Sequence, residues 1–430
     1  MVTTRRGVRA GTAALAAAGM VALGACSGGP AVGGDEEIAL TFAFWGDASR
    51  ADRYEESIAL FEEEHPNVTV QPSYAGFGDY WTARNTEAAG SSLPDVFQMD
   101  VTYLYQYAST HQLLPLDEYT RDTIDISSFP ESVMPATRVD GQIYGIPTST
   151  GTLANFFNAD LLADLGMEPP EGDLTWDEYD AYLTEVAGAG ADHDPVVDGS
   201  TQYVQIMSVF EIWLAQRGKT LYTPEGELGF TEGDLAEWWG RGTRMLESGG
   251  FVDPKRTEQL ESDTLSARYT ASEISFYNFL VRFTEGTGGD EFTMTLPPAD
   301  DPDDRGLYLK PSLMLSIGAN SEHPEVAAEF IDFITNDPQV SEIFGTSRGV
   351  PVSASAIEGL DAEGLDAQIL EYWEQVAEFA DDAPPPPPEG AGAVEAEFIR
   401  IAQDVAFGAT SIDDGVAEFF TSASGIVGTR

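Results

Sequence analysis

Residue types that carry out chemistry in proteins are present in this chain, but few of them occur at spacings that indicate a reaction. The four histidines are His65, His111, His193 and His323, and no two of them have the spacing of a pair of metal ligands. The sequence contains no Gly-x-Gly-x-x-Gly turn and no phosphate loop. Its 73 acidic residues place carboxylates at almost any spacing by chance. We therefore expect no enzyme, no metal and no other cofactor.

Length and charge limit what the protein can be. At about 150 residues per domain, 430 residues suggest two or three domains. The hydrophobic content of 42% is that of a soluble globular protein. The 21 basic and 73 acidic residues give a formal net charge of −52, and such a surface repels phosphate backbones. Nucleic acid is therefore excluded as a partner.

The first 25 residues are typical of an export signal. Arg5, Arg6 and Arg9 precede an apolar run from 10 to 25, shorter than the roughly 20 residues that span a bilayer. The sequence Leu23-Gly24-Ala25-Cys26 resembles the lipobox of bacterial lipoproteins, whose cysteine carries a diacylglycerol. Cys26 is also the only cysteine, so a disulfide within one chain is impossible.

These features predict three consequences for the mature protein. We expect a signal peptide over 1–25, a tether over 26–37, and acyl chains such as palmitate on Cys26. Two or three acyl chains hold a soluble domain stably at the outer face of the cell membrane. The Arg5-Arg6 pair leaves the export route open between the general and the twin-arginine pathway.

Strand and helix patterns alternate through the first part of the remaining chain. Apolar, β-rich segments occupy 38–45, 68–70 and 94–100. Helical patterns follow them, the first running from Ser49 to His65 with Ser49 and Asp52 as a capping box. The others cover 79–89 and a tyrosine-rich segment after Asp100. This order indicates an α/β fold.

The second part of the chain continues the pattern. A crossing between lobes is expected at 148–151, then a strand at 153–157, a helix capped by Asn158, and a capping box from Thr175 to Glu178. Residues 203–247 are predicted to be helical. Strands at 273–277, 292–296 and 313–317 are expected to complete a second sheet, and helices to begin at Pro324 and Pro338. The run from Pro384 to Pro388 is interpreted as a stiff loop between helices.

Six short motifs occur in an order that is similar to one known family. The motifs are Phe44-Trp45-Gly46-Asp47, Leu93-Pro94-Asp95-Val96 with Leu113 to Asp117, Gly141 to Pro147 with Phe157-Asn158, Thr175 to Glu178, Pro324 to Phe333, and Arg348-Gly349-Val350-Pro351. With these motifs, nearly the whole mature chain resembles the family 1 extracellular solute-binding proteins, the receptors of carbohydrate ABC importers. Within the family, the segments from Trp213 to Lys219 and from Tyr308 to Ser312 resemble an actinobacterial branch.

The resemblance implies a fold and a domain organisation. The fold is α/β, of the two-lobed periplasmic-binding-protein type (type II), with a ligand cleft between lobes joined by hinge strands. We expect lobe 1 over 38–150 and 316–354, and lobe 2 over 151–315 and 355–430.

A pyranose presents an apolar C–H face and a rim of hydroxyls, so its site needs aromatic rings and polar side chains. Such residues are expected at strand ends facing the cleft. Asp47 and Asp100 would accept hydroxyl protons, and Lys310 would donate to a hydroxyl or pair with a sugar carboxylate. The expected ligand-binding residues are Trp45, Asp47, Asp100, Ser149, Thr150, Trp213, Phe276, Tyr277, Asn278, Tyr308 and Lys310.

Other roles remain open for several of these residues. Each aromatic side chain could belong to a core, Asp100 could cap a helix, and Ser149 and Thr150 could make ordinary hydrogen bonds at the hinge. Phe276-Tyr277 stands where the family more often has a tryptophan, which leaves the stacking geometry and the sugar open.

The resemblance implies a binding function. A monomeric, lipid-anchored protein would capture a sugar or oligosaccharide outside the cell and deliver it to the permease subunits of an ABC importer. Two alternatives stay open at this point. One is a secreted carbohydrate-active enzyme. The other keeps the fold but binds a polyamine, a sugar phosphate or a metal chelate.

Overall fold

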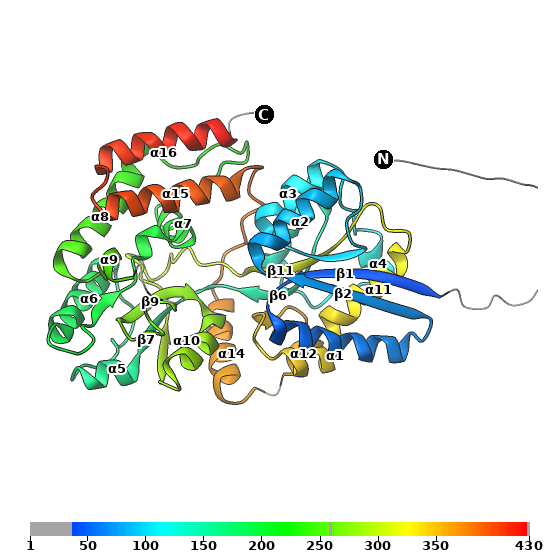
Figure 1. Ribbon diagram of the computed structural model, residues 1–430, viewed down its shortest axis with the longest axis horizontal. Coiled ribbons are helices and arrows are strands. Elements are labelled where there is room, and N and C mark those ends of the chain that lie inside the picture. Colours follow the sequence, from blue (N-terminus) through cyan, green and yellow to red (C-terminus); the bar gives the residue numbers. More distant parts are fainter. Residues whose placement is uncertain (1–36, 258–259, 261, 361, 428–430) are drawn as a thin grey trace, which may run out of the picture. The chain divides into compact units, whose positions relative to one another are not determined.

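The computed structural model describes residues 37–430, except 258–259, 261, 361 and 428–430. The predicted signal peptide and the lipidation residue Cys26 lie outside these residues. Residues 38 onward form one compact unit, which contains two main β-sheets with helices on both faces of each (Figure 1).

The first sheet has six strands in the order β12-β6-β11-β3-β1-β2. Strand β1 pairs in parallel with β2 and β3, whereas β11 runs antiparallel to both β3 and β6. The strands are β1 (Ile38–Trp45), β2 (Val68–Ala75), β3 (Val96–Met99), β6 (Ile146–Gly151), β11 (Lys310–Ile317) and β12 (Val350–Pro351).

Side chains alternate between two cores on either face of this sheet. Phe42 and Phe44 of β1 pack with α1 and α11, whereas Ala43 packs on the opposite face with α2 and α3. This is the alternation that a strand covered on both sides requires. The helices are α1 (Ala48–Glu64), α11 (Pro324–Asn336) and α12 (Pro338–Phe344) on one face, and α2 (Phe77–Ala89) and α3 (Val101–Ser109) on the other.

The second sheet has four strands in the order β10-β7-β9-β8. Its central strand β7 is buried along its whole length and pairs antiparallel with both β9 and β10. The strands are β7 (Leu153–Asn158), β8 (Asp198–Ser200), β9 (Thr270–Phe276) and β10 (Phe292–Thr295).

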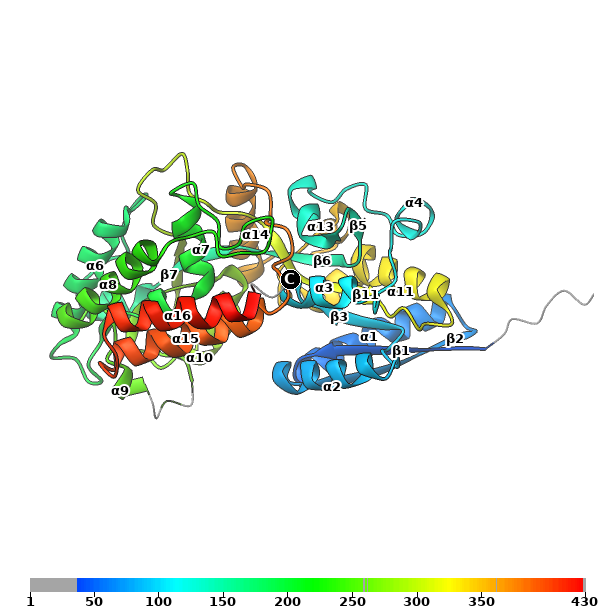
Figure 2. The same ribbon diagram turned by 90° about the horizontal axis from the view of Figure 1, so that it is seen from above.

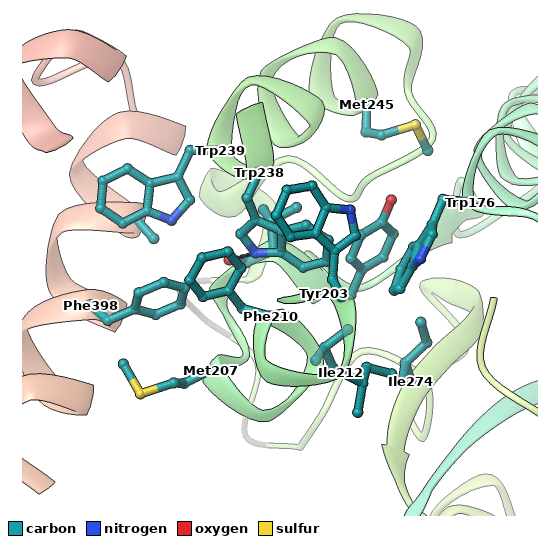
Figure 3. Close-up of a cluster of buried hydrophobic side chains, with 14 of the residues drawn as sticks. Trp176, Tyr203, Met207, Phe210, Ile212, Trp238, Trp239, Met245, Ile274 and Phe398 are labelled. Atoms are coloured by element: carbon teal, nitrogen blue, oxygen red, sulfur yellow. Dashed lines mark hydrogen bonds between the residues drawn. The ribbon is translucent and has the colours of Figure 1, made fainter. Parts of the chain in front are cut away.

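An aromatic core fills one side of the second sheet. Trp176, Phe210, Trp213 and Trp238 are at most 1% exposed, and Figure 3 shows Trp176, Phe210 and Trp238 converging with Tyr203 from separate helices. The helices are α5 (Ala159–Asp164), α6 (Trp176–Gly190), α7 (Met207–Ala215), α8 (Glu232–Ser248), α15 (Ala391–Ala406) and α16 (Ile412–Val427), with α10 (Leu280–Thr287) and α14 (Gly364–Ala377) on the other side.

Short elements complete the described fold. They are α4 (Tyr119–Asp122), α9 (Pro254–Thr257), α13 (Ala354–Glu358), the small hairpin of β4 (Arg138–Val139) and β5 (Gln142–Ile143), and the 3₁₀ helices η1 (Glu131–Thr137), η2 (Tyr203–Gln205) and η3 (Tyr277–Phe279).

The chain passes between the two sheets where β6 ends and β7 begins. Gly151 of β6 pairs with Lys310 of β11, and Thr150 pairs with Val350 of β12. Figure 2 shows β6 and β11 side by side. Three segments that are distant in sequence therefore meet at this crossing. The lobe boundaries predicted at residues 150 and 315 stay a prediction.

Three local expectations are wrong. The strand at 313–317 belongs to the first sheet and not the second, because its apolar side chains suit either core and only long-range pairing decides between them. Helix α1 begins at Ala48 and is capped by Asp47, which accepts a hydrogen bond from the Arg50 N–H at 3.0 Å, so Ser49 is not the cap. The helical segment 203–247 is interrupted between α7 and α8, where Pro224 and several glycines favour turns.

Candidate functional site

A cavity of about 730 Å³ is lined by residues of α3, of η1 and β4, of α7 and the loop after it, and by the segment from Asp381 to Glu395. Its volume lies within the range of about 300–1,000 Å³ that is usual for small-molecule sites. Tyr308 and Lys310 line both this cavity and a small adjoining pocket that Phe276 also lines.

A tyrosine–glutamate pair forms part of the cavity wall. Helix α7 places Ser208 and Glu211 one turn apart, and both line the cavity. The hydroxyl of Tyr308 donates a hydrogen bond of 2.5 Å to Glu211 Oε2. Burial raises the pKa of the Glu211 carboxyl, and the hydrogen bond from Tyr308 and the charge of Lys310 oppose this rise. The cavity wall thus contains a hydrogen-bonded polar pair.

Lys310 is the first residue of β11 and stands beside the crossing between the sheets. Its Nζ lies 4.4 Å from the centre of the Phe276 ring, within the range of a cation–π contact. No ion pair within 4 Å joins Lys310 to another described residue. The carboxylates of Glu211 and Glu395 interact with its charge, but over a longer distance. Its ammonium is therefore available to a ligand.

A second glutamate faces Lys310 from α15. Glu395 lines the cavity and its side chain keeps contact with solvent. Partial desolvation by the surrounding protein nevertheless raises the pKa of its carboxyl. The charge of Lys310 opposes this rise, whereas the charge of Asp100 adds to it. Asp100 caps α3 by accepting a hydrogen bond of 2.8 Å from the Thr102 N–H. It therefore serves as a cap and also contributes negative charge to this region.

The proline run forms another part of the wall. Pro384 to Pro388 line the cavity between α14 and α15. Two backbone hydrogen bonds fix the segment before this run. The Asp381 N–H donates to the Leu307 carbonyl at 2.9 Å, and the Ala383 N–H donates to the Ser132 carbonyl at 2.8 Å. These hydrogen bonds fix the position at which the proline run begins, and the prolines make the run itself stiff.

The expected ligand-binding residues fall into several groups. Tyr308 and Lys310 line the cavity, Phe276 lines the adjoining pocket, and Asp100 acts on the cavity through its charge. Asn278 lies in η3 and is half-buried. None of the remaining six is among the described residues that line the cavity or the adjoining pocket.

Four of the other six are buried in the protein. Trp213 is 1% exposed in the aromatic core, where its ring lies 5.3 Å from that of Trp238. Ser149, Thr150 and Tyr277 are buried at the crossing between the sheets. The Ser149 hydroxyl donates to the Arg348 carbonyl at 2.6 Å. These positions favour the packing and hinge roles that the sequence left open.

The last two lie at the end of β1. Trp45 is half-buried and packs edge-on against Phe77 and Tyr80, each at 5.5 Å between ring centres. Asp47 is exposed and caps α1. Neither is among the described residues that line the cavity.

Sequence reasoning missed Glu211, Glu395, Tyr105 and Tyr222, which all line the cavity. No local pattern distinguishes them, since the two glutamates are among 73 acidic residues and the tyrosines among 16. The sequence predicts the proline run as a stiff loop but does not indicate that it lines the site.

The segment between α12 and β12 contains a serine motif that also occurs in hydrolases. Gly345-Thr346-Ser347-Arg348-Gly349 has the letters Gly-x-Ser-x-Gly. A nucleophile elbow joins a strand to a helix, whereas this segment follows helix α12 and leads into strand β12. The Ser347 hydroxyl donates to the Phe344 carbonyl at 2.7 Å. The motif therefore lacks the geometry of a hydrolase elbow.

Comparison with known proteins assigns the family. The model of the bacterial extracellular solute-binding proteins matches residues 56–370. The chain belongs to this family. Members of the family bind solutes and are not enzymes. In the part of this solute-binding protein that the structure describes, every helix is too short or too polar to cross a bilayer.

Individual relatives are distant. An uncharacterised extracellular-binding protein of an ABC transporter from Pyrococcus horikoshii is 23% identical over 312 residues, covering 69% of this chain and 68% of the relative. An arabinooligosaccharide-binding protein from Halalkalibacterium halodurans is 28% identical over 153 residues, 34% of each chain. The structure of a periplasmic oligogalacturonide-binding protein from Yersinia enterocolitica has a TM-score of 0.78 at 21% identity, covering 91% of this chain and 99% of the other. This likeness confirms the two-lobed fold.

Proposed function

We propose that this solute-binding protein captures an oligosaccharide in the cavity beside Lys310 and delivers it, chemically unchanged, to the permease of an ABC importer. The observation that carries the proposal is the composition of the cavity wall. It combines rings and proline C–H faces with polar groups, among them Lys310, the Tyr308–Glu211 pair and Glu395. A sugar, which is apolar on its faces and polar at its rim, matches such a wall.

The size of the cavity and two of the relatives support an oligosaccharide. A volume of about 730 Å³ exceeds the needs of a single pyranose. The relatives from Halalkalibacterium halodurans and Yersinia enterocolitica are named for binding oligosaccharides.

A thermal-shift screen of the purified mature domain against neutral and acidic mono- and oligosaccharides tests the proposal. A ligand present at 100 times its dissociation constant stabilises the folded state by about 2.7 kcal/mol, which raises Tm by several degrees. We expect at least one oligosaccharide to raise Tm, and chromatography of the mixture to recover it uncleaved. A panel without any shift contradicts sugar binding, and a cleavage product contradicts a purely binding role.

We also propose that acyl chains on Cys26 anchor the protein to the outer face of the membrane. The support is the lipobox-like sequence that ends at Cys26. Cells fed a labelled palmitate analogue should label the wild type but not Cys26→Ser, and detergent-phase partition should move the variant into the aqueous phase. Because the chain has one cysteine, label on Cys26→Ser would contradict the anchor.

A further inference from the structure

Negative charge predominates on the wall of the cavity. Five acidic residues and three basic residues line it, counted over the described residues: Asp140, Glu211, Asp381, Asp382 and Glu395 against Arg138, Lys219 and Lys310. Asp100 adds its field from the start of α3. The excess of acids over bases persists at the site itself and is not only a property of the outer surface.

Two of the three basic residues are already paired. Lys219 forms an ion pair with Asp234, and Arg138 lies 3.5 Å from Asp117 and donates to the Gly141 carbonyl at 2.9 Å. Lys310 is then the cation left for a ligand, and Glu211 and Glu395 both act on it. A ligand carboxylate that approached Lys310 would meet the fields of these two glutamates at the same time.

Several groups of the wall only accept hydrogen bonds. Carboxylates only accept hydrogen bonds, and a proline contributes a carbonyl but no N–H. The five prolines from 384 to 388 therefore offer acceptors without a single backbone donor. The Tyr308 hydroxyl already donates to Glu211. These acceptors suit ligand groups that donate, as hydroxyls do. Because the hydroxyls of Ser208 and Tyr222 also line the cavity and can donate, it is the charges of the wall that disfavour a ligand carboxylate.

We infer that the cavity selects oligosaccharides without negative charge and rejects their uronic-acid counterparts. Like charges brought together at a binding site weaken binding strongly, so the rejection follows from the wall. The inference rests on the proposed function and narrows it. It also distinguishes this chain from the structurally similar oligogalacturonide-binding protein, because the fold alone does not set the charge of the ligand.

The test uses three forms of one sugar. The first neutral oligosaccharide that raises Tm is oxidised at its primary hydroxyls to give the uronate, and part of the uronate is converted to the uncharged amide. Calorimetry then gives Kd for the parent, the acid and the amide. We expect the acid to bind at least about tenfold more weakly than the amide, and the amide to bind within about threefold of the parent.

Salt provides an independent readout. Between about 50 mM and about 500 mM NaCl, Kd of the acid should fall towards that of the amide as repulsion is screened, while Kd of the amide stays constant. A Glu395→Gln variant should also narrow the acid-to-amide ratio of Kd values. Glu55→Gln, which removes an exposed acid from α1, is the matched control and should leave that ratio unchanged.

The outcomes separate the inference from the proposed function. An acid that binds as tightly as the amide, or whose Kd rises with salt, overturns the charge selection while sugar binding stands. An amide as weak as the acid also overturns it, because size and not charge would then be responsible. If only uronates raise Tm in the initial screen, the inference is likewise wrong. If no sugar of any kind binds, the proposed function fails first.

Discussion

The hydroxyl of Tyr277 donates a hydrogen bond to the backbone carbonyl of Thr150. The same hydroxyl accepts a hydrogen bond of 2.7 Å from the backbone N–H of Val350. Tyr277 follows β9 of the second sheet, whereas Thr150 and Val350 are paired residues of the first. One fully buried side chain thus connects two backbone segments at the crossing between the sheets.

Replacing Tyr277 by phenylalanine should reduce the free energy of unfolding by about 1–3 kcal/mol, because the buried Val350 N–H loses its acceptor. Urea denaturation measures the loss. Tyr182→Phe is the control, since its hydroxyl donates to the Glu168 carbonyl at 2.8 Å on the exposed surface, and we expect it to cost less than about 1 kcal/mol. Equal losses in the two variants would contradict a special role for Tyr277 at the crossing.

Gly349 approaches the same crossing so closely that a side chain has no room. Its φ is +101°, and a Cβ would lie 2.2 Å from the Thr150 carbonyl oxygen and 2.6 Å from Ser312 Oγ. Gly141 has a φ of +83° with open space around it. Gly141→Ala should cost about 1–2 kcal/mol for its backbone conformation alone. Gly349→Ala should cost clearly more by chemical denaturation, and a similar cost in both would show that the crossing can relax.

Lys310→Met tests the ammonium of the cavity wall while keeping a long side chain. A hydrogen bond to a charged group contributes about 1.5–3 kcal/mol, so affinity for the sugar found in the screen should fall roughly 10- to 100-fold. Lys255→Met removes an exposed lysine of α9 and should leave Kd unchanged. If Lys310→Met bound the sugar as well as the wild type, the ligand would have to lie elsewhere in the cavity.

Local signals predicted most of the elements. The capping box of Thr175 and Glu178 and the cap at Asn158 are confirmed, because a cap is formed by neighbours in sequence. The sheet to which β11 belongs was not predicted correctly. That choice depends on pairing Met314 with Met99, more than two hundred residues away in the sequence, and on no local pattern.

The site was less accessible from the sequence than the fold. Lys310 and Tyr308 could be selected because lysine is rare in this chain and the family resemblance pointed to this segment. Glu211 and Glu395 face Lys310 only because α7 and α15 pack against the same core. Trp213 illustrates the opposite case, since an indole that suits a sugar is equally suited to the core in which it lies.

A buried carboxyl in β9 should make stability depend on pH. Glu273 is 7% exposed. Burial and, to a smaller extent, the charge of Asp263 raise the pKa of its carboxyl from the ordinary value near 4.5 to about 7, against the opposing effects of Arg282 and a hydrogen bond with Ser275. Between these two pH values the folded protein holds a proton that the unfolded chain has lost, so stability falls as pH rises. Glu273→Gln removes this contribution.

The free energy of unfolding of the wild type relative to Glu273→Gln should therefore decrease by about 3 kcal/mol from pH 4 to pH 8, measured by urea denaturation. Glu178→Gln is the control with the opposite sign, because hydrogen bonds from the Thr175 N–H and hydroxyl lower the pKa of Glu178. Its contribution is present above the ordinary pKa of a glutamate and is lost as pH falls. If the difference in unfolding free energy between the wild type and Glu273→Gln did not change with pH, the Glu273 carboxyl would have to be in contact with water. In that case α10 and β7 would not enclose it.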